Sequence, residues 1–215
     1  MDFSSEQIIR GITGFVIVII SLSFHEWGHA TMADKFGDDT PRRMGRVTFN
    51  PVAHVDPIGT VLLPLLALFI NFPVVGWAKP VLINPDNLPK TSQRAWVTIA
   101  GPGMNLLLAA IAAIASGVLL RFGPGGAAQH YVSVFMLINI NLMMFNLLPV
   151  PPLDGSKFLM YWFGMSERAY AGFARFGWVI LMVLINVPQT QGLFVAMLTW
   201  AREPFLTITE IVREI

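Results

Sequence analysis

Three ionisable side chains, His25, Glu26 and His29, stand within five residues near the end of an apolar stretch that runs from Ile8 to Met32. A charge at the centre of a membrane helix costs roughly 2.5 to 3.5 kcal/mol on insertion scales, so such a cluster needs a functional reason. On a helix, residues i and i+4 share one face, so both imidazoles can bind one metal ion while Glu26 lies beside the open coordination position. The pattern is typical of zinc hydrolases.

The alternative is a pair of buried, hydrogen-bonded histidines with a purely structural role. A chance His-Glu-x-x-His in a chain of this composition is expected on the order of a few times in a thousand, which favours the metal. The chain has no cysteine, so only His, Asp and Glu can be the ligands. His54, beside Asp56, is a weaker candidate. We leave it outside the site, because a histidine with an ordinary partner is commoner there.

Two histidines do not complete a zinc site, and Asp154 is the candidate for the third ligand. It follows an apolar run in the sequence Asn146-Leu-Leu-Pro-Val-Pro-Pro-Leu-Asp154-Gly155. The three prolines prevent a regular helix, and irregular backbone at membrane depth is tolerated where it lines a protein-walled or wet cavity. The alternative is an interfacial turn in which Asp154 caps a helix over residues 157–163.

Asn146 is a candidate substrate-binding residue. Its amide can hydrogen-bond an extended peptide or a developing oxyanion. Its alternative role is to satisfy carbonyl groups that Pro149 leaves without a donor.

The composition places these residues in a bilayer, because 54% of the chain is hydrophobic, 13% is charged and the mean hydropathy is +0.62. We expect an all-α polytopic membrane protein with about five to six transmembrane helices. The apolar runs cover residues 8–33, 58–72, 95–120, 131–148 and 172–187, with a short sixth run at 192–201. A net charge of +1 gives no reason to expect nucleic acid as a partner.

The segments between the runs predict two further features near the site. Residues 45–50 have the character of a strand and predict a small β-hairpin, whereas residues 73–91 predict a re-entrant segment. Basic residues in the 34–57 loop favour a cytoplasmic side for the end of the first span, and so an active site nearer the cytoplasm. No linker or repeat divides the chain, so residues 1–215 are expected to form a single membrane-embedded domain.

Two motifs of this chain resemble those of the site-2 protease family of intramembrane zinc metalloproteases. They are HEWGHA at residues 25–30 and NLLPVPPLDG at residues 146–155. The small-residue sequence at 100–105 is similar to a core-helix motif of that family. Residues 50–59 and 76–80 resemble a compact prokaryotic subgroup, and no PDZ-like or CBS-like domain is recognised.

The resemblance implies one zinc ion held by His25, His29 and Asp154, with Glu26 as the catalytic glutamate and Asn146 in contact with substrate. It also implies hydrolysis of peptide bonds within or near transmembrane segments of single-span proteins, that is, regulated intramembrane proteolysis. The expected location is a prokaryotic cell (inner) membrane, with the lipid bilayer and a membrane-protein substrate as partners; a homo-oligomer is compatible with the sequence.

Two other functions fit the same residues. A divalent-metal transporter would use His25, Glu26, His29 and Asp154 as a transit site, although transit usually needs ligands along a path. A catalytically inactive scaffold would bind membrane helices without cutting them. Metal flux would support the transporter, and binding of substrates without cleavage would support the scaffold.

Overall fold

The computed structural model describes residues 4–63, 77–123 and 126–215, and within these ranges the chain is mostly helical with no β-strand. The chain forms two compact units, Met1–Pro89 and Lys90–Ile215. The single membrane-embedded domain expected from the sequence stays a prediction.

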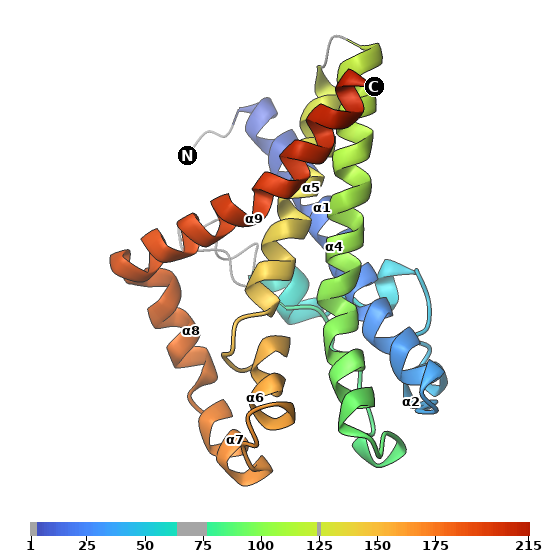
Figure 1. Ribbon diagram of the computed structural model, residues 1–215, viewed down its shortest axis with the longest axis vertical. Helices are drawn as coiled ribbons and strands as arrows, with labels where there is room; N and C mark the ends of the chain where they lie inside the picture. Colours follow the sequence, from blue (N-terminus) through green and yellow to red (C-terminus); the bar gives the residue numbers. More distant parts are fainter. Residues whose placement is uncertain (1–3, 64–76, 124–125) are drawn as a thin grey trace. The chain divides into compact units, whose positions relative to one another are not determined.

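The first unit is organised around one long helix, α1, which spans Ser5–Lys35 (Figure 1). The short elements that follow are α2 (Thr40–Arg43), η1 (Pro51–Ala53), η2 (Pro57–Leu62) and η3 (Pro85–Asn87). The three η elements all begin at an Asn-Pro or Asp-Pro pair, where the Asn50, Asp56 or Asn84 side chain accepts a backbone hydrogen bond from the turn it precedes. Proline is favoured at the first position because its missing N–H would have no partner there.

The second unit packs three helices, α4, α5 and α9, side by side (Figure 1). Their bounds are Thr91–Phe122, Ala127–Asn146 and Pro188–Glu214, and the shorter elements between α5 and α9 are η4 (Asp154–Lys157), α6 (Phe158–Tyr161), α7 (Glu167–Ala174) and α8 (Gly177–Asn186). The buried core consists of Ala109, Ala112, Ala113, Met136, Ile140, Ala201 and Phe205. Small residues on α4 let neighbouring helices approach closely, as in many membrane bundles.

In the described part of the chain, three helices are long and apolar enough to cross a membrane: α1 from Ile9 onward, α4 and α5. Helices α7 and α8 together meet the same test but bend by 52° at the break between them, which makes up to four spans among the described residues. The expected span at 58–72 lies mostly outside the described residues. The run at 192–201 belongs to α9, which is not among these span candidates.

The β-hairpin expected near residues 45–50 is absent from the described structure, where this segment is a turn followed by irregular chain. Gly45 takes a positive φ of 67°, which ends any regular pairing at that point. The Arg46 N–H donates to the Pro41 carbonyl over 2.8 Å, and the Asn50 side chain starts η1. Local side-chain and turn contacts thus use the groups that a strand ladder would need.

Candidate active site

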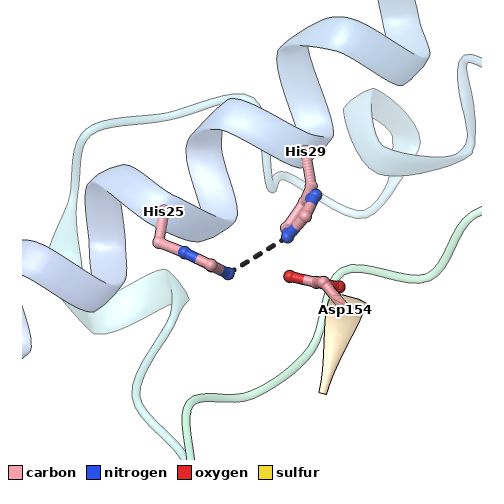
Figure 2. Close-up of side chains that lie close together, drawn as sticks. All are labelled: His25, His29 and Asp154. Atoms are coloured by element: carbon pink, nitrogen blue, oxygen red, sulfur yellow. Dashed lines mark hydrogen bonds between the residues drawn. The ribbon is translucent and has the colours of Figure 1, made fainter. Parts of the chain in front are cut away.

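The two histidines of α1 present their Nε2 atoms to each other. These atoms are 3.1 Å apart, and the ring planes meet at 81° (Figure 2). Both side chains are buried, with exposed fractions of 3% for His25 and 6% for His29. The i, i+4 spacing of an α-helix therefore brings two imidazole nitrogens to one point, as the sequence predicts.

This pair fits a metal ion. Two imidazole nitrogens bound tetrahedrally at the usual Zn–N distance of about 2.0 to 2.1 Å would be roughly 3.3 Å apart, close to the separation found here. Histidine nitrogen and carboxylate oxygen are also the donors that catalytic zinc sites use.

Glu26 lies between the two histidines in sequence and is half-buried. Its Oε2 accepts a hydrogen bond of 3.0 Å from the backbone N–H of Val81, a residue 55 positions later. One carboxylate oxygen is thus held by a fixed donor from an irregular segment of the same unit. A general base needs this kind of orientation as well as a suitable pKa.

Aromatic side chains flank the histidine motif on α1. The Phe49 ring lies 4.4 Å from that of Trp27 and 5.3 Å from that of Phe24, measured between centroids. Phe49 itself stays more than half exposed at 57%. The chain that the sequence assigns to a hairpin therefore packs against the motif through an aromatic ring, with no strand pairing.

In the second unit, Asp154 begins the η4 turn and is 7% exposed; its side chain is drawn in Figure 2. Its Oδ1 accepts a hydrogen bond of 2.9 Å from the ammonium group of Lys157. Leu153 is the N-cap of η4 and Lys157 that of α6, and neither helix start has a side-chain cap. Asp154 therefore occupies neither N-cap position, which disagrees with the alternative in which it caps a helix over residues 157–163.

The backbone around Asp154 is tightly packed within its unit. A Cβ on Gly155 would overlap the carbonyl groups of Leu147 and Leu148, and one on Gly177 would overlap the carbonyl of Pro151. Only glycine fits where two stretches of backbone come this close. The turn that carries Asp154 therefore packs directly against the backbone at the C-terminal end of α5.

Asn146 is the last residue of α5, and its side-chain amide donates to the Leu142 carbonyl over 2.9 Å. The carbonyl that Pro149 leaves without its helical donor is that of Phe145, which accepts from the Leu148 N–H over 3.1 Å. The Asn146 side chain therefore does not supply the missing donor to this carbonyl, which was the alternative role expected from the sequence.

His54 is 1% exposed and lies within hydrogen-bond distance of the Thr48 carbonyl, 3.0 Å from its Nε2. Its Nδ1 is buried without a hydrogen-bond partner in the described structure. An ordinary backbone partner at Nε2 agrees with leaving this residue outside the proposed metal site.

Two groups of the first unit cannot be predicted from the sequence. The first is the Val81 N–H, since a backbone donor has no residue-type signature. The second is Asp38, a fully buried carboxylate that accepts hydrogen bonds from Thr40, Asn84 and Asn87. Burial favours its neutral form, but these bonds outweigh burial and lower the pKa of Asp38 from its ordinary value. Aspartate after a helix is too common in loops to signal such a role.

Comparison with known proteins agrees with this chemistry. The chain matches the model of peptidase family M50 over residues 13–124 and 124–184. It is 35% identical over 203 residues to YwhC of Bacillus subtilis, covering 90% of this chain and 89% of that protein. It is 32% identical over 192 residues to Rip2 of Mycobacterium tuberculosis, covering 86% of this chain and 73% of Rip2.

A more distant relative, MJ0611 of Methanocaldococcus jannaschii, is 30% identical over 152 residues, 68% of this chain and 71% of that protein. All three relatives carry zinc metalloprotease names. No solved structure gives a significant match. The apolar helices indicate a membrane protein, and the family match and these relatives show that the chain belongs to peptidase family M50, the site-2 protease family of metalloproteases.

Proposed function

We propose that this protein is a zinc-dependent intramembrane endopeptidase that hydrolyses peptide bonds within or near transmembrane segments of single-span membrane proteins. One observation carries the proposal: in a chain of family M50, two imidazole nitrogens converge to 3.1 Å on a helix apolar enough to span a bilayer. Regulated intramembrane proteolysis is the biological class to which this reaction would belong.

His25, His29 and Asp154 are the proposed ligands of one zinc ion. All three side chains are buried, and imidazole nitrogen and carboxylate oxygen are the donors that catalytic zinc sites use. A buried carboxylate and two neutral imidazoles would leave a single positive charge on the site, which suits a low-dielectric setting better than an uncompensated ion. When bound, zinc supplies a Lewis acid that polarises the peptide carbonyl and lowers the pKa of water.

Glu26 is the proposed general acid and base. It would take a proton from the attacking water as the carbon–oxygen bond forms at the peptide carbonyl. It would then give that proton to the amine nitrogen as the carbon–nitrogen bond breaks, so one water is consumed and a carboxyl and an amino terminus are released. Its Oε2 is already bonded to the Val81 N–H, which supports Oε1 as the oxygen that handles the proton.

The depth of Glu26 in the first span sets two requirements. It lies nine residues before Lys35, the end of α1, or about 14 Å along the axis. Water must therefore reach it through protein-lined space. A helical substrate hides its peptide bonds, so it must also unwind locally, which favours substrates with helix-breaking residues.

Asn146 is the proposed contact to the extended substrate. The described bond to Leu142 uses one N–H of its amide, so the second N–H and the carbonyl oxygen can pair with a peptide backbone. Such donors can also stabilise a developing oxyanion.

The location we propose is a prokaryotic inner membrane, with the active site nearer the cytoplasm. Lys35 ends the first span, and Arg42, Arg43 and Arg46 follow it within a short segment, which is the bias expected of a cytoplasmic loop. Five or six spans remain our proposal for the whole chain, since most of the second apolar run, at 64–72, lies outside the described residues.

The test is to incubate purified protein with a mixture of single-span membrane peptides and to identify the cut sites by mass spectrometry, with Glu26→Gln as the matched variant and zinc content measured for both. Cuts inside apolar segments that disappear in zinc-loaded Glu26→Gln support the proposal. Cleavage by Glu26→Gln at the wild-type rate would remove Glu26 from the mechanism. Metal flux into sealed vesicles without cleavage would support the transporter instead.

A further inference from the structure

Residues 77–88 form an irregular segment that crosses close to the catalytic motif within the first unit; we refer to it as the 77–88 segment. The backbone N–H of Val81, in its middle, donates to Glu26 Oε2 over 3.0 Å. Apart from the η3 turn, the segment has no regular secondary structure. What holds its shape must therefore come from contacts on either side of Val81.

The first set of contacts lies before Val81. The Lys79 N–H donates to the His54 carbonyl over 2.9 Å, and the Trp77 N–H donates to the Gly59 carbonyl over 3.2 Å. The Thr60 hydroxyl donates to the Trp77 carbonyl over 2.7 Å. A Cβ on Gly59 would overlap the Trp77 indole, so this end of the segment is also held by close packing.

The second set of contacts lies after Val81 and converges on Asp38. One carboxylate oxygen accepts from the Asn84 N–H over 2.8 Å, and the other accepts from Asn87 Nδ2 over 2.9 Å. Thr40 adds a hydroxyl bond of 2.6 Å that orients the same carboxylate. Asp38 is fully buried, and bonds between a buried charge and its donors are among the stronger ones in proteins.

We propose that Asp38 is a positioning residue for Glu26. By holding Asn84 and Asn87, it keeps the 77–88 segment in a shape that places the Val81 N–H on Glu26 Oε2. The bond then fixes the carboxylate rotamer and leaves Oε1 for the reacting water. This proposal rests on the proposed function for the role of Glu26, but the contact between Val81 and Glu26 can be tested without any turnover.

The first test is hydrogen–deuterium exchange of the Val81 amide in detergent-solubilised full-length protein. We expect slow exchange in the wild type and exchange at least about tenfold faster in Glu26→Ala, because the acceptor is gone. Asp38→Asn should also speed exchange at Val81. An Asn side chain has one acceptor oxygen and cannot keep all the bonds that Asp38 accepts from Thr40, Asn84 and Asn87, so the 77–88 segment would be held less firmly. The matched control is Asp39→Asn, the neighbouring carboxylate, which pairs with Arg43 on the surface.

The second test separates positioning from folding. Asp38→Asn should lower kcat for a transmembrane peptide about tenfold while KM and zinc content stay near wild type, because misplacement of a catalytic group affects the reaction step. Val81→Pro, which removes the donor itself, should do the same, and Val81→Ala, which keeps the N–H, should lose far less. If Asp38→Asn fails to fold, Asn87→Ala removes one bond to Asp38 and should give a smaller change in the same direction.

The outcomes distinguish the two proposals. Equal protection of Val81 in wild type and Asp38→Asn, or wild-type kcat in Val81→Pro, would overturn the positioning role while leaving a metalloprotease that depends on Glu26. Full activity of Glu26→Gln would remove Glu26 from the proposed mechanism, and a positioning role of Asp38 for Glu26 in catalysis would be overturned as well. Loss of zinc together with activity in Asp38→Asn would mean that Asp38 supports the fold and does not position Glu26.

Discussion

The ammonium group of Lys157 lies 2.9 Å from Oδ1 of Asp154, three residues earlier on the η4 turn. This ion pair occupies one oxygen of the proposed zinc ligand and so orients the other. Partners of metal ligands typically affect metal affinity about 10- to 100-fold. We expect Lys157→Met to weaken zinc binding within this range, as measured by competition with a chromophoric chelator.

The control for this experiment is Lys157→Arg, which keeps the positive charge and should retain most of the affinity. Lys90→Met removes one exposed positive charge elsewhere in the chain and corrects for the change in net charge. An unchanged zinc affinity in Lys157→Met would mean that the ion pair does not orient Asp154.

Zinc stoichiometry should depend on each proposed ligand. Purified wild type is expected to bind one zinc per chain, and His25→Ala, His29→Ala and Asp154→Ala should each lose most of it. The measurement is metal analysis by mass spectrometry after dialysis, with helix content checked by circular dichroism. His54→Ala is the matched histidine variant and should keep its zinc. Loss of zinc in His54→Ala with retained helix content would bring that residue into the site.

Gly155 should tolerate no side chain. In Gly155→Ala the new Cβ would overlap the backbone of Leu147 and Leu148, and overpacking of this kind costs roughly 1 to 3 kcal/mol or more. Gly103→Ala, at a helical position of α4 with no heavy atom within 4 Å of the added carbon, should be neutral or stabilising by up to about 1 kcal/mol. The melting temperatures of both variants and of the wild type are measured by thermal unfolding in detergent. A melting temperature of Gly155→Ala equal to that of the wild type would show that the turn at Asp154 relaxes to accept the methyl group.

Asp38 should make stability depend on acid pH. Because its folded pKa is lowered relative to about 3.9 in the unfolded chain, its stabilisation is present above that value and is lost as the pH falls through the folded pKa. The difference in melting temperature between wild type and Asp38→Asn should therefore be largest near pH 7 and shrink below about pH 4. A difference that stays constant from pH 7 to pH 3 would contradict the assignment of these bonds to an ionised carboxylate.

A buried amide pair links α4 to α5. Asn105 donates to the side-chain oxygen of Asn139 over 2.9 Å, and both residues are fully buried. A double-mutant cycle with Asn105→Ala and Asn139→Ala should give a coupling of about 0.6 kcal/mol and at most about 1.7 kcal/mol, as for other membrane helices. Unfolding with increasing amounts of a denaturing detergent measures the free energy of unfolding of each variant. Strict additivity would show that the pair contributes no coupling.

The part of the site that the sequence predicts well is the part that local geometry determines. Helical spacing alone brings His25 and His29 together, and the prolines before Asp154 correctly indicate irregular chain there. The long apolar runs likewise become α1, α4 and α5, because 18 or more apolar residues leave few other structures possible in a bilayer.

The structure of residues 45–50 cannot be predicted from their pattern. Their polar and apolar side chains alternate as in a strand, but contacts with other parts of the chain determine the structure. The Arg46 guanidinium turns inward to carbonyl groups of Ala53 and Lys79, and Phe49 packs on Trp27. The donor at Val81 could not be predicted for another reason, because it is a main-chain group. On our proposal, its position depends on the bonds from Asp38 to residues 46 and 49 positions later. Single-sequence patterns carry no information on such distant pairings.

Helix α9 determines how far a recombinant form of this protein can be shortened at its C-terminus, because residues of α9 belong to the buried core. The M50 match stops at residue 184, yet Ala201 and Phe205 of α9 are 6% and 5% exposed in the same core as α4. Thr209 adds a hydroxyl bond of 3.1 Å to the Ala113 carbonyl. A chain cut at the family boundary would keep every proposed catalytic residue but uncover an alanine-rich face of α4, and would be expected to aggregate on extraction from the membrane.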